Sequence, residues 1–555
     1  RWRRNGGGCV ESSDPPSGQI LGCGLHTKKR GPQRSPPRCV PPHPERARDS
    51  AQRSLRQTHR YHPDVTNAPV KSPTTLQALR SPRLLTTEAL AGAVTTLALI
   101  PEVISFSVIA GVDPKVSLIA SVVLAISMSI LGGRPAMITA AAGAVALVVA
   151  PLVHTHGVEY LLPTVILAGI IQILFGVLGL ARIMRFIPRS VMIGFVNALG
   201  ILIFAAQLQH VLDVPAMVYP LFALTLVVVL VLPRFTKAVP APLVAIVLVT
   251  AIAMFAHLSV PTVGDQGEVS GGLPGITPLE VPVDLDTLRL ILPTALSVAF
   301  VGLMETLLTA KLVDDITDTR SHKSRESWAL GVANILAGCW GGIAGCAMIG
   351  QTVVNVKLGR ARTRLSTFFA GVMLLILVTV LSDLMEAIPM AALAAVMMVV
   401  AVSTVNLHSV RPSTLKRMPV SETLVMVTTV VVVVATNNLA IGVAAGALLA
   451  MVLFARRVAH VTTVRRLVTD GAARYTVRGP LFFGSSNDLV EQFSYAEDPP
   501  QVTVDFSAAQ IWDASTVAVL DSVQTKYAEH DIEVRFTGLD EHSTQFHGRL
   551  TGTLN

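Results

Sequence analysis

Residues 341–357 read Gly-Gly-Ile-Ala-Gly-Cys-Ala-Met-Ile-Gly-Gln-Thr-Val-Val-Asn-Val-Lys, a glycine-rich opening followed by a short apolar segment. A similar interruption occurs earlier, where Gly132, Gly133 and Pro135 open the segment 134–153, which is rich in Ala and Gly. Interrupted apolar segments at corresponding positions of two halves of a chain indicate a transport site in an inverted-repeat membrane protein. Their half-helices would begin inside the membrane, where free N–H groups and positive helix-dipole ends attract an anion. The small residues could instead serve only close helix packing.

The composition is that of a membrane protein. The 555 residues are 51% hydrophobic and 14% charged, whereas soluble domains usually carry about a quarter charged residues. A hydrocarbon core about 30 Å thick requires about 20 mainly apolar residues in a helix. In lipid, a helix satisfies the backbone hydrogen-bonding groups of such a segment internally. We predict fourteen segments, at residues 86–110, 116–131, 134–153, 160–181, 186–209, 217–232, 239–258, 288–312, 327–345, 347–357, 364–383, 387–405, 420–437 and 438–456.

The charges of the connecting loops predict the orientation of these segments. With the N-terminus inside, the predicted outer loops contain only Lys115 and Arg289 as basic residues, and the long outer loop 259–287 is acidic. Short cytoplasmic loops favour Lys and Arg, so we predict a multi-pass protein of the cell (inner) membrane with both termini in the cytoplasm. The long loop divides the transmembrane domain, residues 84–458, into repeats at about 84–260 and 286–457. An odd number of segments makes the two repeats face opposite ways.

Residues 1–83 form a basic tail, with 16 Lys and Arg against 5 Asp and Glu. The tail is rich in Pro, Arg, Ser and Gly, so we expect it to be disordered or to reflect a misplaced translation start. A basic tail can bind anionic lipid or nucleic acid, but we expect no nucleic-acid partner. The five cysteines do not have zinc-site spacing, and we predict neither a metal site nor a cofactor.

Two carboxylates lie inside the predicted spans. Glu102 follows Pro101 in the first span, and Glu305 lies midway along the eighth span, which opens the second repeat. A charge at membrane depth costs at least about 2.5–3.5 kcal/mol and usually marks a transport pathway. A carboxylate beside an anion repels it unless a cation is bound, so we predict H⁺ or Na⁺ as the coupling ion. Each Glu could instead be a protonated structural residue.

Four runs of sequence, at residues 100–114, 133–139, 300–305 and 345–355, resemble signatures of the SulP anion transporters. That family includes bacterial sulfate and bicarbonate carriers and animal anion exchangers. The resemblance extends from about residue 84 to the end of the chain. It implies a polytopic α-helical membrane protein with about 14 spans in a 7+7 inverted repeat, the architecture that the segments predict.

The resemblance also implies an anion site between the third and tenth spans. Carried over by motif position, the substrate-binding residues are Phe106, Ile138, Thr139, Ala140, Ile349, Gly350, Gln351 and Thr352, with Glu305 and Glu102 as cation-coupling carboxylates. Gln351 stands where many relatives have Arg, and Glu102 stands where many have Gln. Both departures favour cation-coupled symport over electroneutral exchange and weaken the case for a divalent substrate.

After a predicted linker at 459–472, the periodicity changes. Strand-like stretches at 475–483, 501–506 and 532–536 alternate with a helix at 515–527, which indicates a small cytoplasmic α/β domain at 473–550. It resembles the STAS domain of SulP proteins. In related anti-sigma-factor antagonists the Ser of an Asp-x-Ser turn is phosphorylated, and Ser515 after Asp513 holds that position. The turn could instead only cap the helix, and the domain could bind a protein partner or stabilise a homodimer, which we expect.

The sequence therefore predicts secondary active transport of a small inorganic anion, sulfate or bicarbonate, coupled to H⁺ or Na⁺. Two alternatives remain open at this point. The substrate could be another anion, such as a dicarboxylate, chloride or nitrate, or the protein could be a membrane sensor or scaffold that signals through its STAS domain without transport. No catalytic constellation occurs in the sequence, so we expect no enzymatic activity.

Overall fold

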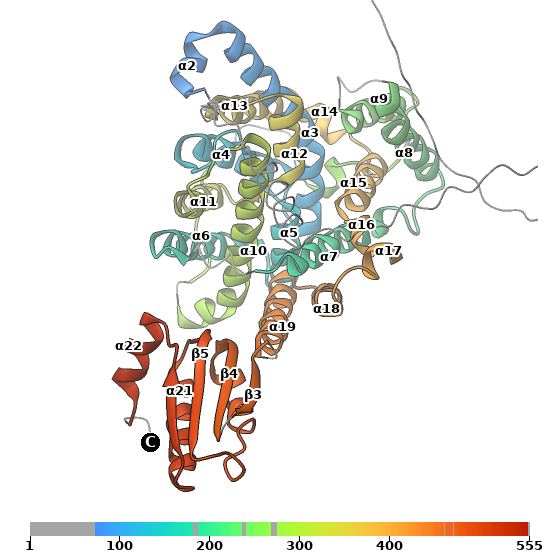
Figure 1. Ribbon diagram of the computed structural model, residues 1–555. Helices are drawn as coiled ribbons and strands as arrows, with labels where there is room; N and C mark the ends of the chain where they lie inside the picture. The colour runs from blue at the N-terminus through green and yellow to red at the C-terminus, as the bar shows by residue number, and fades with distance from the viewer. Residues whose placement is uncertain are drawn as a thin grey trace, which may run out of the picture. The chain divides into compact units, whose positions relative to one another are not determined.

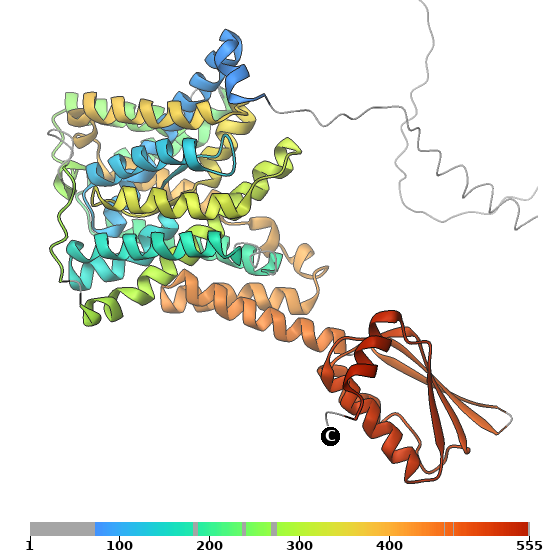
Figure 2. The same cartoon turned by 90° about the vertical axis from the view of Figure 1, so that its left-hand side faces the viewer.

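The computed structural model describes residues 73–180, 187–235, 240–267, 275–282, 284–459, 461–469 and 471–552 (Figure 1). Each of the fourteen predicted segments contains a helix, and Figure 2 shows the long helices lying side by side. These helices are α3 (Pro82–Ala110), α4 (Pro114–Leu131), α5 (Gly143–His156), α6 (Leu161–Val177), α7 (Arg189–Gln207), α8 (Val218–Phe235), α9 (Ala241–Phe255), α10 (Leu285–Thr317), α11 (Lys323–Gly338), α12 (Ile349–Val353), α13 (Arg364–Val380), α15 (Met390–Thr404), α18 (Val420–Thr436) and α19 (Leu439–Ala459). Short helices are α2 (Thr75–Arg80), α14 (Ser382–Glu386), α16 (Leu407–Val410) and α17 (Pro412–Leu415).

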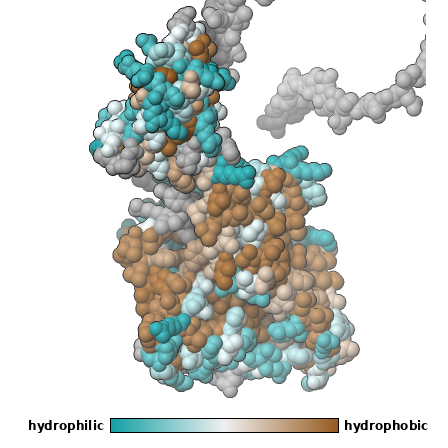
Figure 3. Space-filling model, turned by 90° about the horizontal axis from the view of Figure 1, so that it is seen from below, coloured by the Kyte–Doolittle hydropathy of each residue, from teal (hydrophilic) through white to brown (hydrophobic). Residues whose placement is uncertain are grey.

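The length and composition of these helices suit a membrane. Among the described residues, seven helices are at least 18 residues long and apolar enough to cross one, and five shorter apolar helices accompany them. Apolar side chains cover much of the helical region on the face that Figure 3 draws. Local sequence marks the helix ends: Pro82 and Pro114 occupy first helical positions, where a missing N–H costs nothing. Gly111 ends α3 with a φ of 71°, which glycine adopts without strain.

The packing of the helices follows the inverted repeat. In one half of the molecule α13 packs against α3 and α4, and in the other half α6 packs against α10 and α11. Each of these helices is the fourth span of its repeat, and it packs against the first two spans of the other repeat. The later spans repeat the pattern, because α18 packs against α7 and α19 while α8 packs against α15 and α9. Two groups of helices result: α3–α6 with α10–α13, and α7–α9 with α15, α18 and α19.

The two repeats meet at a pair of three-residue strands. Strand β1 (Thr139–Ala141) pairs antiparallel with β2 (Gly345–Ala347), so that Ala140 lies opposite Cys346. Helix α5 begins at Gly143 directly after β1, and α12 begins at Ile349 directly after β2. Helix α12 continues as the π-helical turn η5 (Val354–Leu358). The predicted third and tenth segments are thus part strand and part helix, because Pro135 and the glycines delay the start of each helix.

Some backbone N–H and carbonyl groups of the two strands have no partner in the ladder, and side chains of neighbouring helices form hydrogen bonds with them. Lipid offers no hydrogen bonds to such groups, so they need partners within the protein. The bonds run from the Gly345 N–H to the Asn334 Oδ1 (2.8 Å), from the Asn334 Nδ2 to the Gly345 carbonyl oxygen (3.2 Å), from the Ala141 N–H to the Ser121 Oγ (3.1 Å) and from the Ala347 N–H to the Thr306 Oγ1 (3.0 Å). Helices α4, α10 and α11 therefore fix the position of the strand pair.

The loop before β1 is held by a buried ion pair. The Arg134 guanidinium lies 2.9 Å from the Asp314 carboxylate and also donates to the Thr319 hydroxyl at 2.7 Å. The Arg134 N–H donates to the Glu326 carboxylate at 2.8 Å. Breaking a buried ion pair is strongly destabilising because one charge remains uncompensated. These contacts therefore hold the loop that precedes β1 against α10 and α11.

The C-terminal domain is built on a four-stranded sheet in the order β3-β4-β5-β6. Its strands are β3 (Thr463–Thr469), β4 (Ala472–Leu481), β5 (Gln501–Ile511) and β6 (Glu533–Thr537), and its helices are α20 (Phe483–Val490), α21 (Ala514–Ala528) and α22 (Glu541–Leu550). Strands β3 and β4 are antiparallel, whereas β4–β5 and β5–β6 are parallel. Parallel neighbours need a crossover connection, which α20 and α21 supply. The predicted α/β domain is confirmed.

A buried carboxylate organises the core of this domain. The hydroxyl groups of Tyr475 and Tyr527 both donate to the Asp498 carboxylate, at 2.7 and 2.6 Å, and Arg466 pairs with the same group at 2.7 Å. Burial and this hydrogen bond raise the pKa of Tyr527 above its ordinary value. A tyrosine hydroxyl is protonated at neutral pH in any case, and here it donates to Asp498.

Two predicted boundaries need correction. Helix α2 and the start of α3 lie inside the predicted tail 1–83, and β3 lies inside the predicted linker 459–472. A capping box starts α2, since Thr74 and Gln77 exchange hydrogen bonds between side chain and backbone, a signal too short to stand out in a polar segment. Strand β3 is mostly exposed and therefore lacks the apolar alternation that predicts a strand. Residues 1–72 lie outside the described part of the chain.

Substitution of Gly345 by Ala should destabilise the fold. The added methyl group would collide with the Ala140 carbonyl oxygen and the Leu124 side chain, and overpacking of this kind costs about 1–3 kcal/mol. Gly350→Ala is the matched control, because a methyl group there meets no atom within 4 Å. The thermal unfolding midpoint of the purified protein in detergent should fall for Gly345→Ala alone. Equal unfolding midpoints for the two variants would mean that β1 and β2 can move apart without loss of stability.

Candidate functional site

A cavity of about 340 Å³ lies where α5 and α12 begin; we refer to it as the central cavity. Both repeats and both groups of helices contribute to its wall. The lining residues are Glu102 and Phe106 of α3, Ala142, Gly143 and Ala144 at the start of α5, Phe195, Val196, Leu199 and Ile203 of α7, Glu305 of α10, Met348, Ile349, Gly350 and Gln351 at the start of α12, and Val400, Ser403 and Thr404 of α15.

The two helix starts give the cavity a positive potential. The first backbone N–H groups of a helix have no partner within it, and each helix N-terminus carries about half an elementary charge. Two such ends at one cavity amount to about one positive charge. Neither Lys nor Arg occurs among the described residues that line it. Backbone dipoles are therefore the source of positive charge that the lining provides.

Glycines shape both helix starts. A Cβ atom on Gly143 would lie 2.5 Å from the Phe106 ring atom Cε1, so the ring packs directly on the α5 backbone. A Cβ atom on Gly350 would meet no atom within 4 Å, so this residue borders open space. The absence of a side chain lets a ligand approach the α12 backbone closely, while Phe106 closes the cavity on the α5 side.

Two carboxylates face the same cavity from the first helix of each repeat. Glu305 is 9% exposed, and the Cys346 Sγ donates to its Oε2 at 2.9 Å. Glu102 lies in the same wall as Gln351, which is 4% exposed in the first turn of α12. The structure thus brings together two acidic groups and two helix N-termini, a combination that can hold an anion beside a cation.

Six of the predicted site residues line the central cavity, and four do not. Those on its wall are Phe106, Ile349, Gly350, Gln351, Glu305 and Glu102. Ile138, Thr139, Ala140 and Thr352 are fully buried beside it. The Ile138 N–H donates to the Thr352 Oγ1 at 3.0 Å, and the Met348 N–H donates to the Ile138 carbonyl oxygen at 2.9 Å. These four residues lie in and around the strand pair, and in this structure they support the wall.

Part of the wall was not anticipated from the sequence. Ala142, Gly143 and Ala144 follow β1 directly, and their role depends on where α5 begins. The remaining wall comes from α7 and α15, whose lining residues are mainly apolar. In such helices an apolar residue that faces a cavity is indistinguishable from one that faces lipid. The hydroxyl groups of Ser403 and Thr404 could have indicated from the sequence that α15 borders the cavity, since polar residues inside a span usually face the protein interior.

Ser515 lies far along the chain, in the C-terminal domain. It is exposed in the first turn of α21, and the preceding Asp513 caps that helix by accepting the Thr516 N–H at 3.1 Å. Asp513 is thus the N-cap of α21. Phosphorylation of Ser515 remains a prediction.

The fold and this site define a class of protein: a helical membrane transporter built from inverted repeats, with a C-terminal α/β domain. The sulfate permease family profile matches residues 85–220 and 212–429, and the STAS domain profile matches residues 464–546. The chain belongs to the sulfate permease (SulP) family and carries a STAS domain. The family consists of anion transporters and not of enzymes.

Curated relatives and solved structures agree with this assignment. The chain is 49% identical over 456 residues to the putative sulfate transporter YbaR of Bacillus subtilis, a match that covers 82% of this chain and 95% of that protein. The transmembrane domain of a cyanobacterial bicarbonate transporter, BicA, is 25% identical with a TM-score of 0.59, covering 65% of this chain and 97% of that one. The structure of SLC26A9 is 17% identical in sequence with a TM-score of 0.71, and the match covers 84% of this chain and 86% of that one. The two proteins share the same fold.

Substitution of Gly143 by Ala tests the geometry of the central cavity. The methyl group should displace the Phe106 ring, and a misfit of one carbon in a packed site costs about tenfold in kcat/KM. We expect anion uptake into proteoliposomes to fall by about that factor, with partial recovery in the double variant Gly143→Ala/Phe106→Leu because the two residues are in contact. Unchanged uptake by Gly143→Ala would place the transport pathway elsewhere.

Proposed function

We propose that this protein is a secondary active transporter that carries a small inorganic anion, sulfate or bicarbonate, across the cell membrane together with H⁺ or Na⁺. The observation that carries the proposal is the central cavity, where two helix N-termini meet Glu102 and Glu305. The helix ends would bind the anion through backbone N–H groups, and the cation would neutralise a carboxylate. A scaffold or sensor that transports nothing would gain no advantage from two acidic groups at this depth.

The charge of the lining favours bicarbonate over sulfate. When both carboxylates are neutralised, the two helix ends leave about one positive charge, which balances a monovalent anion. A divalent anion would require a further positive charge, and Gln351, in the first turn of α12, supplies none. The names of two similar proteins point to different substrates, since BicA is a bicarbonate transporter and YbaR is a putative sulfate transporter. Both anions therefore belong in the experiments below.

Glu305 is our candidate for the coupling group. Its carboxylate lies in the cavity wall, 9% exposed, and has the Cys346 thiol as a weak donor. An ionised carboxylate in this position would repel the anion and would be costly to desolvate. A bound H⁺ or Na⁺ removes both penalties. Anion and cation would then enter together, and the gradient of the cation would drive accumulation of the anion.

The two groups of helices suggest how access alternates. The central cavity has walls from α3, α5, α10 and α12 on one side and from α7 and α15 on the other. Movement of one group against the other would open the cavity to either side of the membrane, as in other inverted-repeat transporters. The groups meet around the site, so a movement of modest size could expose it.

Glu305→Gln should abolish accumulation driven by a cation gradient. The amide has nearly the shape of the acid but cannot bind a proton or neutralise Na⁺, so uptake should stop at equilibrium while the protein remains folded. Uptake of labelled bicarbonate and sulfate into proteoliposomes with imposed H⁺ or Na⁺ gradients measures this, and Glu159→Gln, in an exposed segment, is the matched control. Undiminished uptake against the anion gradient by Glu305→Gln would contradict the coupling role.

Gln351→Arg should change the preference between anions. A fixed positive charge in the first turn of α12 favours a divalent over a monovalent anion, and a charge about 4 Å away is worth several kcal/mol even near a protein surface. We expect the ratio of sulfate to bicarbonate affinity to rise by about tenfold or more. Gln351→Met, which removes the amide without adding charge, serves as the control. An unchanged ratio would remove Gln351 from the site.

Further expectations concern the whole protein. We infer that both termini and the STAS domain lie in the cytoplasm, since the predicted inner loops hold most basic residues, and that the protein forms a homodimer. Ser515 is exposed at a helix N-terminus, where a phosphate group would be stabilised by the helix dipole. Its phosphorylation could change how the STAS domain binds a partner protein.

A further inference from the structure

A pocket of about 200 Å³ lies where α7 and α18 begin and α19 ends; we refer to it as the arginine pocket. The three helices pack against one another. The lining residues are Pro188, Arg189 and Ser190 at the start of α7, Ser421, Glu422 and Val425 of α18, and Ala450, Leu453, Phe454 and Arg457 of α19. None of them lines the central cavity.

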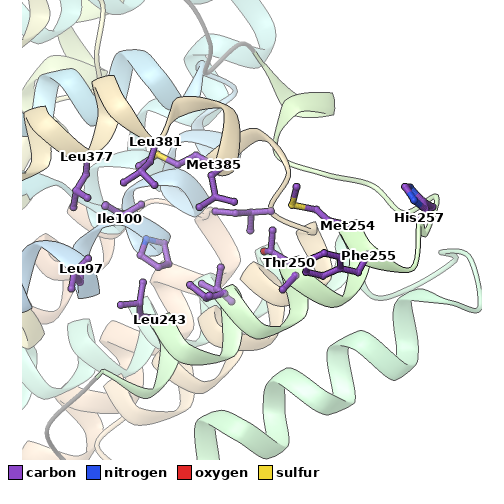
Figure 4. A pocket seen from close by; sticks show the side chains of 16 residues that line it. Leu97, Ile100, Leu243, Thr250, Met254, Phe255, His257, Leu377, Leu381 and Met385 are labelled. Atoms are coloured by element: carbon purple, nitrogen blue, oxygen red, sulfur yellow. The ribbon is translucent and has the colours of Figure 1, made fainter.

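The charge of its lining distinguishes the arginine pocket from the groove of about 630 Å³ that runs along α9 (Figure 4). The side chains labelled in Figure 4 are apolar apart from Thr250 and His257. Such a lining is suited to hydrocarbon and selects no particular ligand. The arginine pocket instead combines two guanidinium groups with hydroxyl groups, which can recognise an anion by charge and by hydrogen bonds.

The two arginines of the pocket have no acidic partner. In the part of the chain that the structure describes, no ion pair joins Arg189 or Arg457 to a carboxylate, although Glu422 lines the same pocket. The Arg457 Nη2 donates to the Ser421 Oγ at 2.6 Å, which holds the guanidinium at the start of α18. A guanidinium bound to a hydroxyl group keeps its whole charge for a ligand.

Ser190 points to a ligand independently of the arginines. It is 4% exposed and lines the pocket, and its hydroxyl group has no hydrogen-bond partner among the described residues. The unpartnered hydroxyl groups of Ser105 and Ser117 are sealed within the protein, whereas that of Ser190 is not. A hydroxyl group that is largely withdrawn from water without a partner is costly, so an acceptor within the pocket would stabilise it.

The starts of α7 and α18 add backbone donors. In each helix the carbonyl oxygen of the preceding proline, Pro188 or Pro419, accepts the N–H groups of the third and fourth helical residues at 3.0–3.3 Å. The N–H groups of the first two residues, 189–190 and 420–421, have no acceptor in the described chain, as is usual at a helix start. The helices are 19 and 17 residues long, so each start carries a full helix dipole.

The fixed charges leave the arginine pocket positive. Two arginines outnumber one glutamate, and two helix N-termini, each about half a positive charge, outnumber the C-terminus of α19. The excess is about one to two positive charges. A phosphodiester carries one negative charge, and arginine binds phosphate oxygens through paired hydrogen bonds. A phosphate group has five non-hydrogen atoms, and five water molecules occupy about 150 Å³ in the liquid, so the pocket has room for one.

The arginine pocket lies at the ends of membrane-spanning helices. Arg457 is in the last turn of α19, whereas Phe454, one turn earlier, is 68% exposed and Val452 is 64% exposed. Exposed apolar side chains suit hydrocarbon, and arginine near a helix end suits the headgroup region. The pocket is therefore at the depth of phospholipid phosphates, directly beside a surface that acyl chains can cover.

We propose that the arginine pocket binds a phosphate group through Arg189, Arg457, the Ser190 hydroxyl and the free N–H groups of α7 and α18. Its position favours the headgroup of an anionic phospholipid as the source, with acyl chains along the exposed face of α19. Soluble phosphate has the same chemistry and is the other source. The site does not depend on the transport function proposed above. It lies on the helix whose Phe195, five residues after Ser190, lines the central cavity.

Binding of tritiated phosphatidylglycerol to the full-length protein in a neutral detergent tests the arginines. Arg189→Gln, and independently Arg457→Gln, should weaken binding by about tenfold or more, because each removes a charge-assisted hydrogen bond to phosphate. Arg456→Gln removes the same charge from an exposed neighbour outside the pocket and should leave the affinity within about twofold. Equal weakening by all three variants would indicate attraction to a basic surface and would overturn the proposal.

The Ser190 hydroxyl is tested in the same assay. Ser190→Ala should weaken binding by about three- to tenfold, because the variant loses one donor and keeps the charge of the pocket. Ser522→Ala, in the C-terminal domain, is the matched control and should bind as the wild type does. An unchanged affinity in Ser190→Ala would contradict the assignment of the phosphate to this pocket.

Competition and direct binding of labelled inorganic phosphate separate the two sources. Diacylglycerol has the acyl chains without the phosphate and should not displace phosphatidylglycerol. Phosphatidylglycerol binding that millimolar phosphate leaves intact would assign the pocket to the lipid. Displacement by phosphate, with phosphate binding that Arg457→Gln abolishes, would assign it to the soluble ion. Displacement by diacylglycerol, or folded wild-type protein that binds neither phosphatidylglycerol nor phosphate, would overturn the proposal.

Discussion

The structure depends on six residues that form the antiparallel ladder of β1 and β2. Lipid supplies no hydrogen bonds, so a chain that leaves the helical conformation inside a membrane must pair with itself. Pairing the two repeats satisfies the extended segments of both at once, and Asn334, Ser121 and Thr306 bind the groups that remain. The ladder also makes α5 and α12 begin at one cavity, so the same constraint that satisfies the backbone creates the site.

The electrostatics of the central cavity follow from this arrangement. Helix ends provide a positive potential without a side chain, and Glu102 and Glu305 provide the opposing charges. A site in which helix ends and carboxylates lie side by side can bind an anion and a cation together and release both. Helix α3 carries Glu102 and therefore contributes to this balance.

Much of the fold could be predicted from the sequence, because an apolar run of sufficient length has few other structures in a membrane. The ladder could not be predicted, since three residues are too few to show the alternation of a strand. The start of α5 could therefore not be predicted, nor could the place of Gly143 on the cavity wall, and the predicted site residues Ile138 and Ala140 lie buried beside that wall. Glu102 and Glu305 were predicted because charged residues stand out within spans, whereas Gln351 was predicted from its position in a motif that resembles the family. The walls from α7 and α15 consist mainly of apolar residues that carry no such signal.

The account rests most directly on coupled transport through the central cavity. The decisive measurement is uptake of labelled bicarbonate and labelled sulfate by the wild-type protein in proteoliposomes, with H⁺ and Na⁺ gradients imposed separately. The pH is kept alkaline so that little of the bicarbonate label is present as carbon dioxide. The account predicts accumulation of bicarbonate above its equilibrium level, driven by one of the two gradients, with sulfate accumulated less. Folded, reconstituted protein that accumulates neither anion under either gradient would contradict it.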